Sequence, residues 1–580
     1  MRLPTLPDNS GALGAAQTAF AGVDYRYGAG NGAIVEELGC SSAYYPALSS
    51  RPAARLMDSR IVGHPNGMTV FGGEPNGASY TGGHHYICDG NNVLRNGVRP
   101  GMELTKNTDM LDTPRTMVGM GKKLIVFPDK LMLDTYYCLQ DHIKPLEASA
   151  ENVSVSFTNG SYAGEDAEAN TITAASASYD WGERFAVGDG LTISGAPYAA
   201  WNGTFIVREI EGNELRFYEH TFDPPEGVTL PVTATITVKR TVPDMDFICE
   251  QGNRLWGCKG DTIYCSKLGD PTNWNVFDGI STDAWSVETG SPGGFTGCCS
   301  FLGYPIFFKA DQIYKVYGTR PENFELVGGP AMGVRPGCGK SLAIVGDVLY
   351  YVSRVGVTAY TGGLPRQATE LFGDIRLADA VGGSDGRRYY LTARDARTSV
   401  WSQWVYDTQT GLLSREEEAW RPEWDEEGAV PPHADYRMVA YGYYNGGILK
   451  LMRSGESTYT GEDRHTEDAD PTYCMAEFGD WDYLSLSRSG AFAALYPVKL
   501  WVRISAAAGA TVTISVRYDG GDWEEAASFD GEGERKDTYM PVPVRRCRRY
   551  ALKLEVSGSS AAFKLLAIER ELVAENKARR

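Results

Sequence analysis

The sequence predicts an all-β protein: a β-propeller of about seven blades, with a small β-barrel or sandwich inserted into it and a C-terminal β-sandwich. Three observations support this prediction. The 580 residues include 67 glycines and 33 tyrosines, and short runs rich in Tyr, Val, Ile and Thr alternate with glycine turns. A unit of two such runs recurs along the chain. No long helical pattern is present, except near the last dozen residues.

The repeated unit begins with Gly, or once Asn, and continues with a strand, a tight turn and a second strand. After Gly346, the run Leu349–Val352 follows three residues later, and a second run begins ten residues later at Gly356. Six further copies begin at Gly83, Gly121, Gly252, Gly303, Gly386 and Asn445. An all-strand repeat of about 40–50 residues is typical of a propeller. Seven copies predict seven blades; six or eight remain open because the first and last copies are weak.

The repeat and its interruptions predict five segments. They are an N-terminal extended segment (1–60), a first part of the propeller (61–146), an inserted β-barrel or sandwich (147–242), a second part of the propeller (243–478) and a C-terminal β-sandwich (479–580). Closure of the propeller by strands from both chain ends is expected to use residues 61–71. Residues 151–178 are poor in large apolar side chains, and we expect a loop there.

Composition excludes several classes of protein. The formal net charge of −19 argues against a sequence-reading nucleic-acid binder, because phosphate contacts need clustered Lys and Arg. The first residues lack the apolar core of a signal peptide, and no run of about 18 apolar residues predicts a membrane span. The 11 cysteines form no CxxC pair, so we expect buried free thiols in a reducing cytosol. A redox role for the adjacent Cys298 and Cys299 is the alternative.

The sequence predicts no catalytic, cofactor-binding or metal-binding residues. His84 and His85 are the only adjacent histidines, and no third ligand has metal-site spacing. The stretch Asp385–Arg388 resembles a sialidase Asp-rich turn but lacks its Thr-Trp ending. No nucleophile elbow, phosphate-binding loop or dinucleotide fingerprint occurs.

Two charged stretches have alternative interpretations. The basic cluster Arg545, Arg546, Arg548 and Arg549 is either a solvated strand edge or a contact with an acidic neighbour or DNA. The acidic stretch Glu416–Glu418 and Asp425–Glu427, with Trp420 and Trp424, is either a solvated loop or a protein contact anchored by the two tryptophans.

Short motifs in four places resemble one family, the tail nozzle or packaged-DNA-stabilisation proteins of short-tailed bacteriophages. At the N-terminus these are Phe20–Asp24 and Tyr45–Pro52. In the third blade they are Asn253–Trp256, Ile263–Ser266, Gly269–Pro271 and Asn273–Trp274. The inserted segment contributes Val187–Asp189, Leu191–Ile193 and Asn202–Phe205, and the C-terminal segment contributes Tyr518–Trp523, Val544–Cys547 and Ile568–Arg570.

The resemblance implies a non-enzymatic structural protein of the virion tail, made in the cytoplasm of the host bacterium. It implies a ring of about six copies below the portal and adaptor proteins that continues and gates the DNA channel for ejection and supports fibres or spikes. Double-stranded DNA would pass without sequence-specific binding and without any cofactor. Two other functions stay open: a receptor- or glycan-binding propeller at the tail tip, and a propeller hydrolase acting on cell-surface glycan.

Overall fold

The computed structural model shows an all-β chain that divides into two compact units, 65–334 and 1–64 with 335–580. Each unit is described by itself. The structure describes residues 12–30, 32–51, 54–56, 65–71, 84–89, 92–95, 115–135, 143–162, 168–420, 443–444, 447–450, 471–482, 495–533, 538–541 and 545–574. Among these residues, helical structure is confined to four 3-10 turns, η3 (Trp181–Glu183), η4 (Ala199–Trp201), η5 (Pro321–Asn323) and η6 (Gly339–Ser341).

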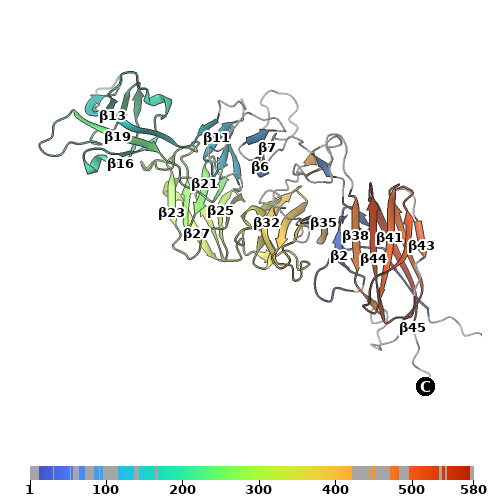
Figure 1. Cartoon of the computed structure of the whole chain (residues 1–580). Helices are drawn as coiled ribbons and strands as arrows, with labels where there is room; N and C mark the ends of the chain where they lie inside the picture. Colours follow the sequence, from blue (N-terminus) through green and yellow to red (C-terminus); the bar gives the residue numbers. More distant parts are fainter. Residues whose placement is uncertain are drawn as a thin grey trace, which may run out of the picture. The chain divides into compact units, whose positions relative to one another are not determined.

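The unit 65–334 contains four small antiparallel sheets in chain order (Figure 1). The first has β6 (Pro65–Phe71), β7 (His84–Asp89) and β8 (Asn92–Arg95). The second has β9 (Thr116–Met120), β10 (Lys123–Phe127), β11 (Leu131–Asp134) and β12 (Ile143–Pro145). The third has β20 (Phe247–Glu250), β21 (Leu255–Lys259), β22 (Thr262–Cys265) and β23 (Trp285–Glu288). The fourth has β24 (Gly297–Phe301), β25 (Tyr304–Lys309), β26 (Gln312–Tyr317) and β27 (Glu325–Pro330).

These sheets have the form and packing of propeller blades. Their first strands contact one another in succession, β6 with β9, β9 with β20 and β20 with β24. In β10, Leu124 and Val126 pack with the first sheet, whereas Ile125 and Phe127 pack with the third. A strand buried on both faces is apolar at every position. This explains the unbroken run Leu-Ile-Val-Phe in the repeat.

The repeat aligns with the sheets strand for strand. Its first run is the second strand of each sheet, and its second run, where present, is the third strand. The leading glycine makes the turn before the second strand. In the described copies it has a positive φ, which an L side chain adopts only with strain, at Gly121, Gly252, Gly303, Gly346 and Gly386.

Residues 148–240 of the same unit form one seven-stranded antiparallel sheet, in the order β16-β15-β19-β13-β14-β18-β17. A core of its own lies against it and includes Phe157, Trp181, Trp201 and Phe222. The strands are β13 (Ala148–Ser161), β14 (Glu168–Ala174), β15 (Gly190–Ser194), β16 (Gly203–Ile206), β17 (Glu209–Glu211), β18 (Glu214–Phe217) and β19 (Val232–Arg240).

The prediction of a loop at residues 151–178 is wrong, because most of this segment forms the strands β13 and β14. Strands β13 and β14 pair there from Val155–Ala174 to Ser161–Glu168. The large apolar side chains of this pair, Val155, Phe157 and Ile172, lie on one face and are buried. Alternation with polar and small residues lowers the apolar content of such a strand without weakening it.

The other unit contains three further small sheets. The first has β28 (Ala343–Val345), β29 (Val348–Ser353), β30 (Gly356–Tyr360) and β31 (Arg366–Gln367). The second has β32 (Leu377–Ser384), β33 (Arg388–Asp395), β34 (Trp401–Asp407) and β35 (Leu412–Trp420). The third joins β36 (Tyr443–Tyr444) and β37 (Gly447–Lys450) to β5 (Ala54–Leu56), which pairs parallel to β37.

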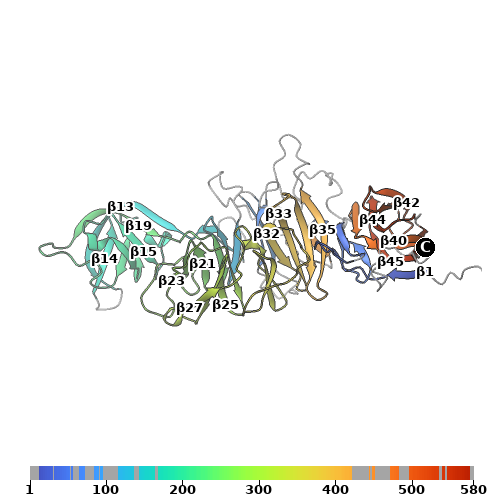
Figure 2. The same cartoon turned by 90° about the horizontal axis from the view of Figure 1, so that it is seen from below.

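A sandwich of two six-stranded sheets completes this unit. One sheet contains β1 (Ala12–Gln17), β3 (Cys40–Ser41), β4 (Leu48–Ser50), β40 (Leu495–Ala506), β43 (Thr538–Pro541) and β45 (Phe563–Ala574). The other contains β2 (Ile34–Leu38), β38 (Tyr473–Phe478), β39 (Trp481–Asp482), β41 (Ala510–Tyr518), β42 (Glu524–Asp530) and β44 (Arg549–Gly558). Figure 2 shows β1 beside β45.

Two features of the chain ends differ from the sequence-based expectation. The described part of segment 1–60 is not a separate extended arm, because β1 to β4 belong to the sandwich and β5 to a small sheet. The strand at residues 65–71, expected to pair with the other chain end, pairs with β7 instead. Strands near the N-terminus pair with distant segments instead: β5 with β37, β2 with β38, and β1 and β4 with β45.

Candidate functional site

Asp385–Arg388 is a structural turn between β32 and β33. The Asp385 carboxylate accepts hydrogen bonds from the backbone N–H groups of Arg387 (2.9 Å) and Arg388 (2.6 Å) and from the Tyr390 hydroxyl (2.9 Å). The Arg387 guanidinium donates to the buried Asp407 carboxylate at 2.8 Å. These contacts fix the ends of the two strands.

The histidine pair and the cysteines supply no metal site within the described residues. His84 and His85 are the first two residues of β7. Across the described part of the chain, no group of three or more His, Cys, Asp or Glu side chains is placed to hold a metal ion. Likewise, no described helix has the length and hydropathy of a membrane span.

The described cysteines are free thiols, and eight of these ten are buried. Cys298 and Cys299 are half-buried on β24. Burial raises the pKa of both thiols well above the ordinary value. The neighbouring Cys298 and burial together do the same for Cys249. A raised pKa lowers the thiolate fraction, which opposes a redox role for this group.

The basic cluster 545–549 lies at the start of β44, on the surface of the sandwich. Arg545 forms an ion pair with Glu524, and Arg549 forms one with Asp480 at 3.0 Å. Arg545, Arg546 and Arg548 precede β44, and only Arg549 lies in it, where it pairs with Asp482 of β39, so the cluster does not line a strand edge as predicted. The four arginines are exposed, whereas Cys547 between them is buried.

The acidic stretch is not a solvated loop at its start. Glu416 is buried within β35, which runs to Trp420. Trp424 and Asp425–Glu427 lie outside the described residues.

Strand β35 is instead one side of a buried joint with the sandwich. The Glu37 carboxylate accepts a hydrogen bond from the backbone N–H of Arg415 at 2.7 Å, and the Arg415 guanidinium pairs with Glu36. Nearby, the Val23 backbone N–H donates to the Leu413 carbonyl oxygen at 2.8 Å. Strand β2 therefore binds both β38 of the sandwich and β35 of the small sheet.

The joint encloses the Glu37 carboxyl group, whose surroundings favour its protonated form. Glu37 has no exposed surface, and burial raises its pKa to about 8. The carboxylates of Glu36 and Glu416 add to this increase, whereas Arg415 opposes it.

A second joint lies in the unit 65–334 and links two motifs of the family resemblance. Buried Asp189, before β15, pairs with Arg240 of β19. Its other carboxylate oxygen accepts from the Asn273 amide at 2.8 Å, and the Asn273 amide oxygen accepts from the Gly190 N–H at 3.0 Å. Asn273 also donates to Asp270 at 2.6 Å. The motifs Val187–Asp189 and Asn273–Trp274 therefore hold the seven-stranded sheet to the third small sheet.

Residues of the terminal motifs contribute to the sandwich and its core. Gln17, shortly before the first motif, pairs with Ile568 in the register of β1 and β45. Phe20 contacts the Phe478 ring, with centroids 6.0 Å apart. Leu48 of the second motif pairs with Leu565. The motifs are visible in the sequence, but their contacts are not, because no local pattern identifies partners so far apart along the chain.

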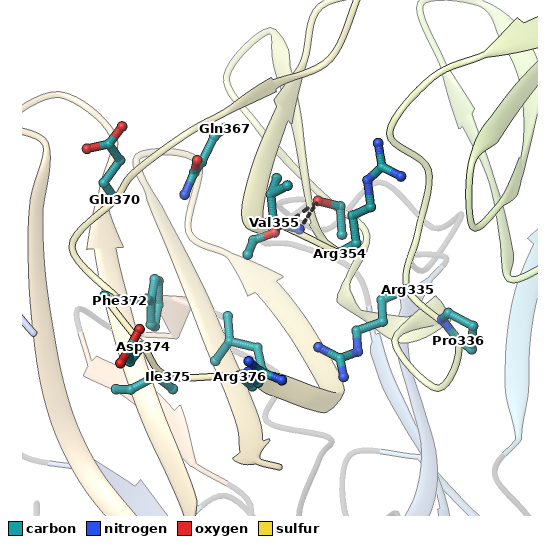
Figure 3. Close-up of a pocket in the computed structure, with 14 residues that line it drawn as sticks. Arg335, Pro336, Arg354, Val355, Gln367, Glu370, Phe372, Asp374, Ile375 and Arg376 are labelled. Carbon is teal, nitrogen blue, oxygen red and sulfur yellow. Dashed lines mark hydrogen bonds between the residues drawn. The ribbon is translucent and has the colours of Figure 1, made fainter. Parts of the chain in front are cut away.

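A cleft of about 590 Å³ opens at the end of the sheet β28–β31 (Figure 3). The loop before η6, the β29–β30 turn and the β31–β32 loop surround it. Its charged lining consists of three arginines and two carboxylates, Arg335, Arg354, Arg376, Glu370 and Asp374. In Figure 3 the arginines lie on one side and the two acids on the other. No local sequence pattern marks this cleft, because Arg335, Arg354 and Arg376 are about 20 residues apart along the chain.

Comparisons with known proteins do not identify the chain. No family profile and no curated protein matches the sequence. Similar solved structures include an exo-β-1,3-galactanase from Phanerochaete chrysosporium (10% identity, 57% of this chain and 95% of that one, TM-score 0.21). They also include a family 43 arabinoxylan arabinofuranohydrolase from Bacillus subtilis (9%, 89% and 96%, 0.21) and the endosialidase of phage phi92 (8%, 94% and 69%, 0.19). Similarity at this level carries no argument about function.

Proposed function

We propose that this chain is a structural protein of a bacteriophage tail, a nozzle subunit that assembles into a ring of about six copies around the DNA channel. Portal and adaptor proteins above it and fibres or spikes around it are its proposed partners. The proposed role needs no catalytic group and no cofactor.

One observation supports the proposal: several of the resembling motifs contain residues that join separate parts of the fold. Asp189 and Asn273 join the seven-stranded sheet to a small sheet, and the segments around Phe20 and Leu48 join the chain ends in one sandwich. A ring subunit that passes DNA under pressure needs fixed joints between its modules. We propose that the seven small sheets are the blades of one propeller.

The charge of the chain suits passage of DNA without retention. Six copies with a net charge of −19 each carry a formal charge of −114. An acidic lumen would not hold the DNA phosphates, and screening beyond about 8 Å at physiological salt limits the repulsion.

Electron microscopy of the purified chain tests this proposal. Class averages are collected at dilute and concentrated protein, with and without the candidate adaptor. We expect rings with a central opening wide enough for duplex DNA. Monomers at every concentration, even with adaptor present, would contradict the nozzle assignment.

A second candidate function is a receptor- or glycan-binding module at the tail tip. The arginine-lined cleft favours it, because a concave site with a few converging polar groups is the usual form of a small-ligand site. Specific retention on a glycan array by a chain that forms no ring would support this candidate over the nozzle.

A further inference from the structure

We propose that the cleft at the end of the sheet β28–β31 binds an acidic saccharide, with Arg335 and Arg376 receiving its carboxylate. The inference specifies a ligand for the second candidate function and rests on it, but it does not depend on ring assembly.

Two arginines that line the cleft, Arg335 and Arg376, carry positive charge that no described carboxylate neutralises. Within the described part of the chain, the guanidinium groups of Arg335 and Arg376 have no hydrogen-bond or ion-pair partner. By contrast, nine described arginines of this unit lie within 4.0 Å of a carboxylate, namely Arg26, Arg387, Arg388, Arg394, Arg397, Arg415, Arg517, Arg545 and Arg549. Guanidinium groups bind planar carboxylates through paired hydrogen bonds, so an anionic ligand is the partner that this cleft lacks.

The opposite wall limits how much negative charge the ligand can carry. Glu370 and Asp374 line the cleft, and each lies near an arginine outside it, Arg26 at 3.9 Å and Arg397 at 3.5 Å. Two carboxylates repel a polyanion such as a nucleic-acid backbone but accept hydrogen bonds from hydroxyl groups. A ligand with one carboxylate and several hydroxyls satisfies both walls, and a sugar acid has this chemistry.

The volume of the cleft and the rigidity of the segment beneath it both suit such a ligand. A volume of about 590 Å³ lies in the range of small-molecule sites, roughly 300–1,000 Å³. The floor is held in place, because Phe372 is buried against the Trp404 ring and the Leu371 carbonyl oxygen accepts from the Tyr25 N–H at 2.8 Å. At Gly373 (φ +51°) a Cβ would lie 2.2 Å from the Tyr25 carbonyl oxygen. A floor fixed before binding loses little entropy when the ligand arrives.

The test is calorimetric titration of the full chain, with its oligomeric state checked by size-exclusion chromatography. The probes are oligomers of glucuronic acid, sialylated lactose, neutral lactose and inorganic phosphate. The variants are Arg335→Ala with Arg376→Ala, the single change Arg335→Lys, and the control Arg366→Ala. Arg366 is an exposed arginine of β31 beside the cleft that does not line it. Thermal unfolding establishes that each variant is folded.

We expect at least one carboxylated saccharide to bind, and neutral lactose not to bind. The double variant should lose at least about tenfold in affinity, Arg335→Lys should lose part of it, and Arg366→Ala should match the parent chain. Absence of binding by both acidic probes, equal binding of lactose, competition by phosphate at equal affinity, or an equal loss in Arg366→Ala would each overturn the proposal. Rings without saccharide binding would contradict only this inference, whereas binding by a chain that never forms rings would contradict only the nozzle.

Discussion

At the scale of single residues, the interior of the chain contains ionisable side chains, among them the ion pair of Arg115 with Asp129 and the carboxyl group of Glu37. Arg115 and Asp129 are both about 1% exposed, and the Arg115 Nε donates to the Asp129 carboxylate at 2.7 Å. Burial raises the pKa of the Glu37 carboxyl group and so favours its protonated form. We expect both groups to affect the free energy of unfolding.

We predict that Asp129→Ala destabilises the protein by about 3–5 kcal/mol, because Arg115 would lose its carboxylate in a buried site. Chemical denaturation monitored by tryptophan fluorescence measures this change. The matched control is Asp134→Ala in the same small sheet, whose partner Lys122 is 62% exposed. The control should cost under about 1 kcal/mol, and equal losses would contradict the argument.

The Glu37 carboxyl group predicts how stability depends on pH. Its pKa rises from 4.5 to about 8 in the folded chain, so the folded state holds this proton more tightly than the unfolded state. The stabilisation is fully present below pH 4.5 and is lost as the pH rises through 8, at about 1.4 kcal/mol per pH unit between these limits. Glu37→Gln keeps an oxygen acceptor for the Arg415 N–H and should flatten the melting temperature between pH 5 and 8. The same slope in both proteins would contradict this assignment.

At the scale of elements, the connections between sheets are the informative features. Strand β10 shows how local sequence specifies a blade, because its alternate residues enter two different cores. The joints are different, since a few polar side chains orient a whole sheet. Asn273 is such a side chain, because its amide donates hydrogen bonds to both Asp189 and Asp270.

We predict that Asn273→Ala loosens the joint while leaving both sheets folded. The change removes hydrogen bonds to Asp189, Asp270 and the Gly190 N–H. Hydrogen exchange should become faster around residues 187–191 and 270–275, and it should stay unchanged in β13 and β14. Asn159→Ala, within the seven-stranded sheet, serves as control, because its side chain accepts only from Asn170 among the described contacts. Uniformly faster exchange would indicate loss of the fold rather than of the joint.

At the scale of the whole molecule, the sandwich depends on both ends of the chain. Strands β1 to β4 belong to its two sheets, and Phe20, Val23, Ile34 and Leu48 are buried in this unit. Without them, apolar side chains of β38 and β45 would be exposed, together with unpaired strand edges.

We therefore expect residues 471–580 alone to show no cooperative unfolding transition. The same segment with residues 12–50 fused to it should regain one. Thermal denaturation followed by circular dichroism distinguishes the two proteins. A cooperative transition in the short segment would show that the N-terminal strands are dispensable for the sandwich.

The all-β class, the repeated pair of strands and the glycine turns between them could be predicted from residue patterns alone. These features are local: a turn needs a residue that tolerates positive φ, and a doubly buried strand needs apolar residues in succession. The contacts between distant segments, by contrast, depend on the tertiary structure. Glu37 and Arg415 are 378 residues apart, and the cleft gathers Arg335, Arg354 and Arg376 from three separate turns. No local pattern encodes such pairs, because they are selected by the packing of complete sheets rather than by the conformational preferences of the residues themselves.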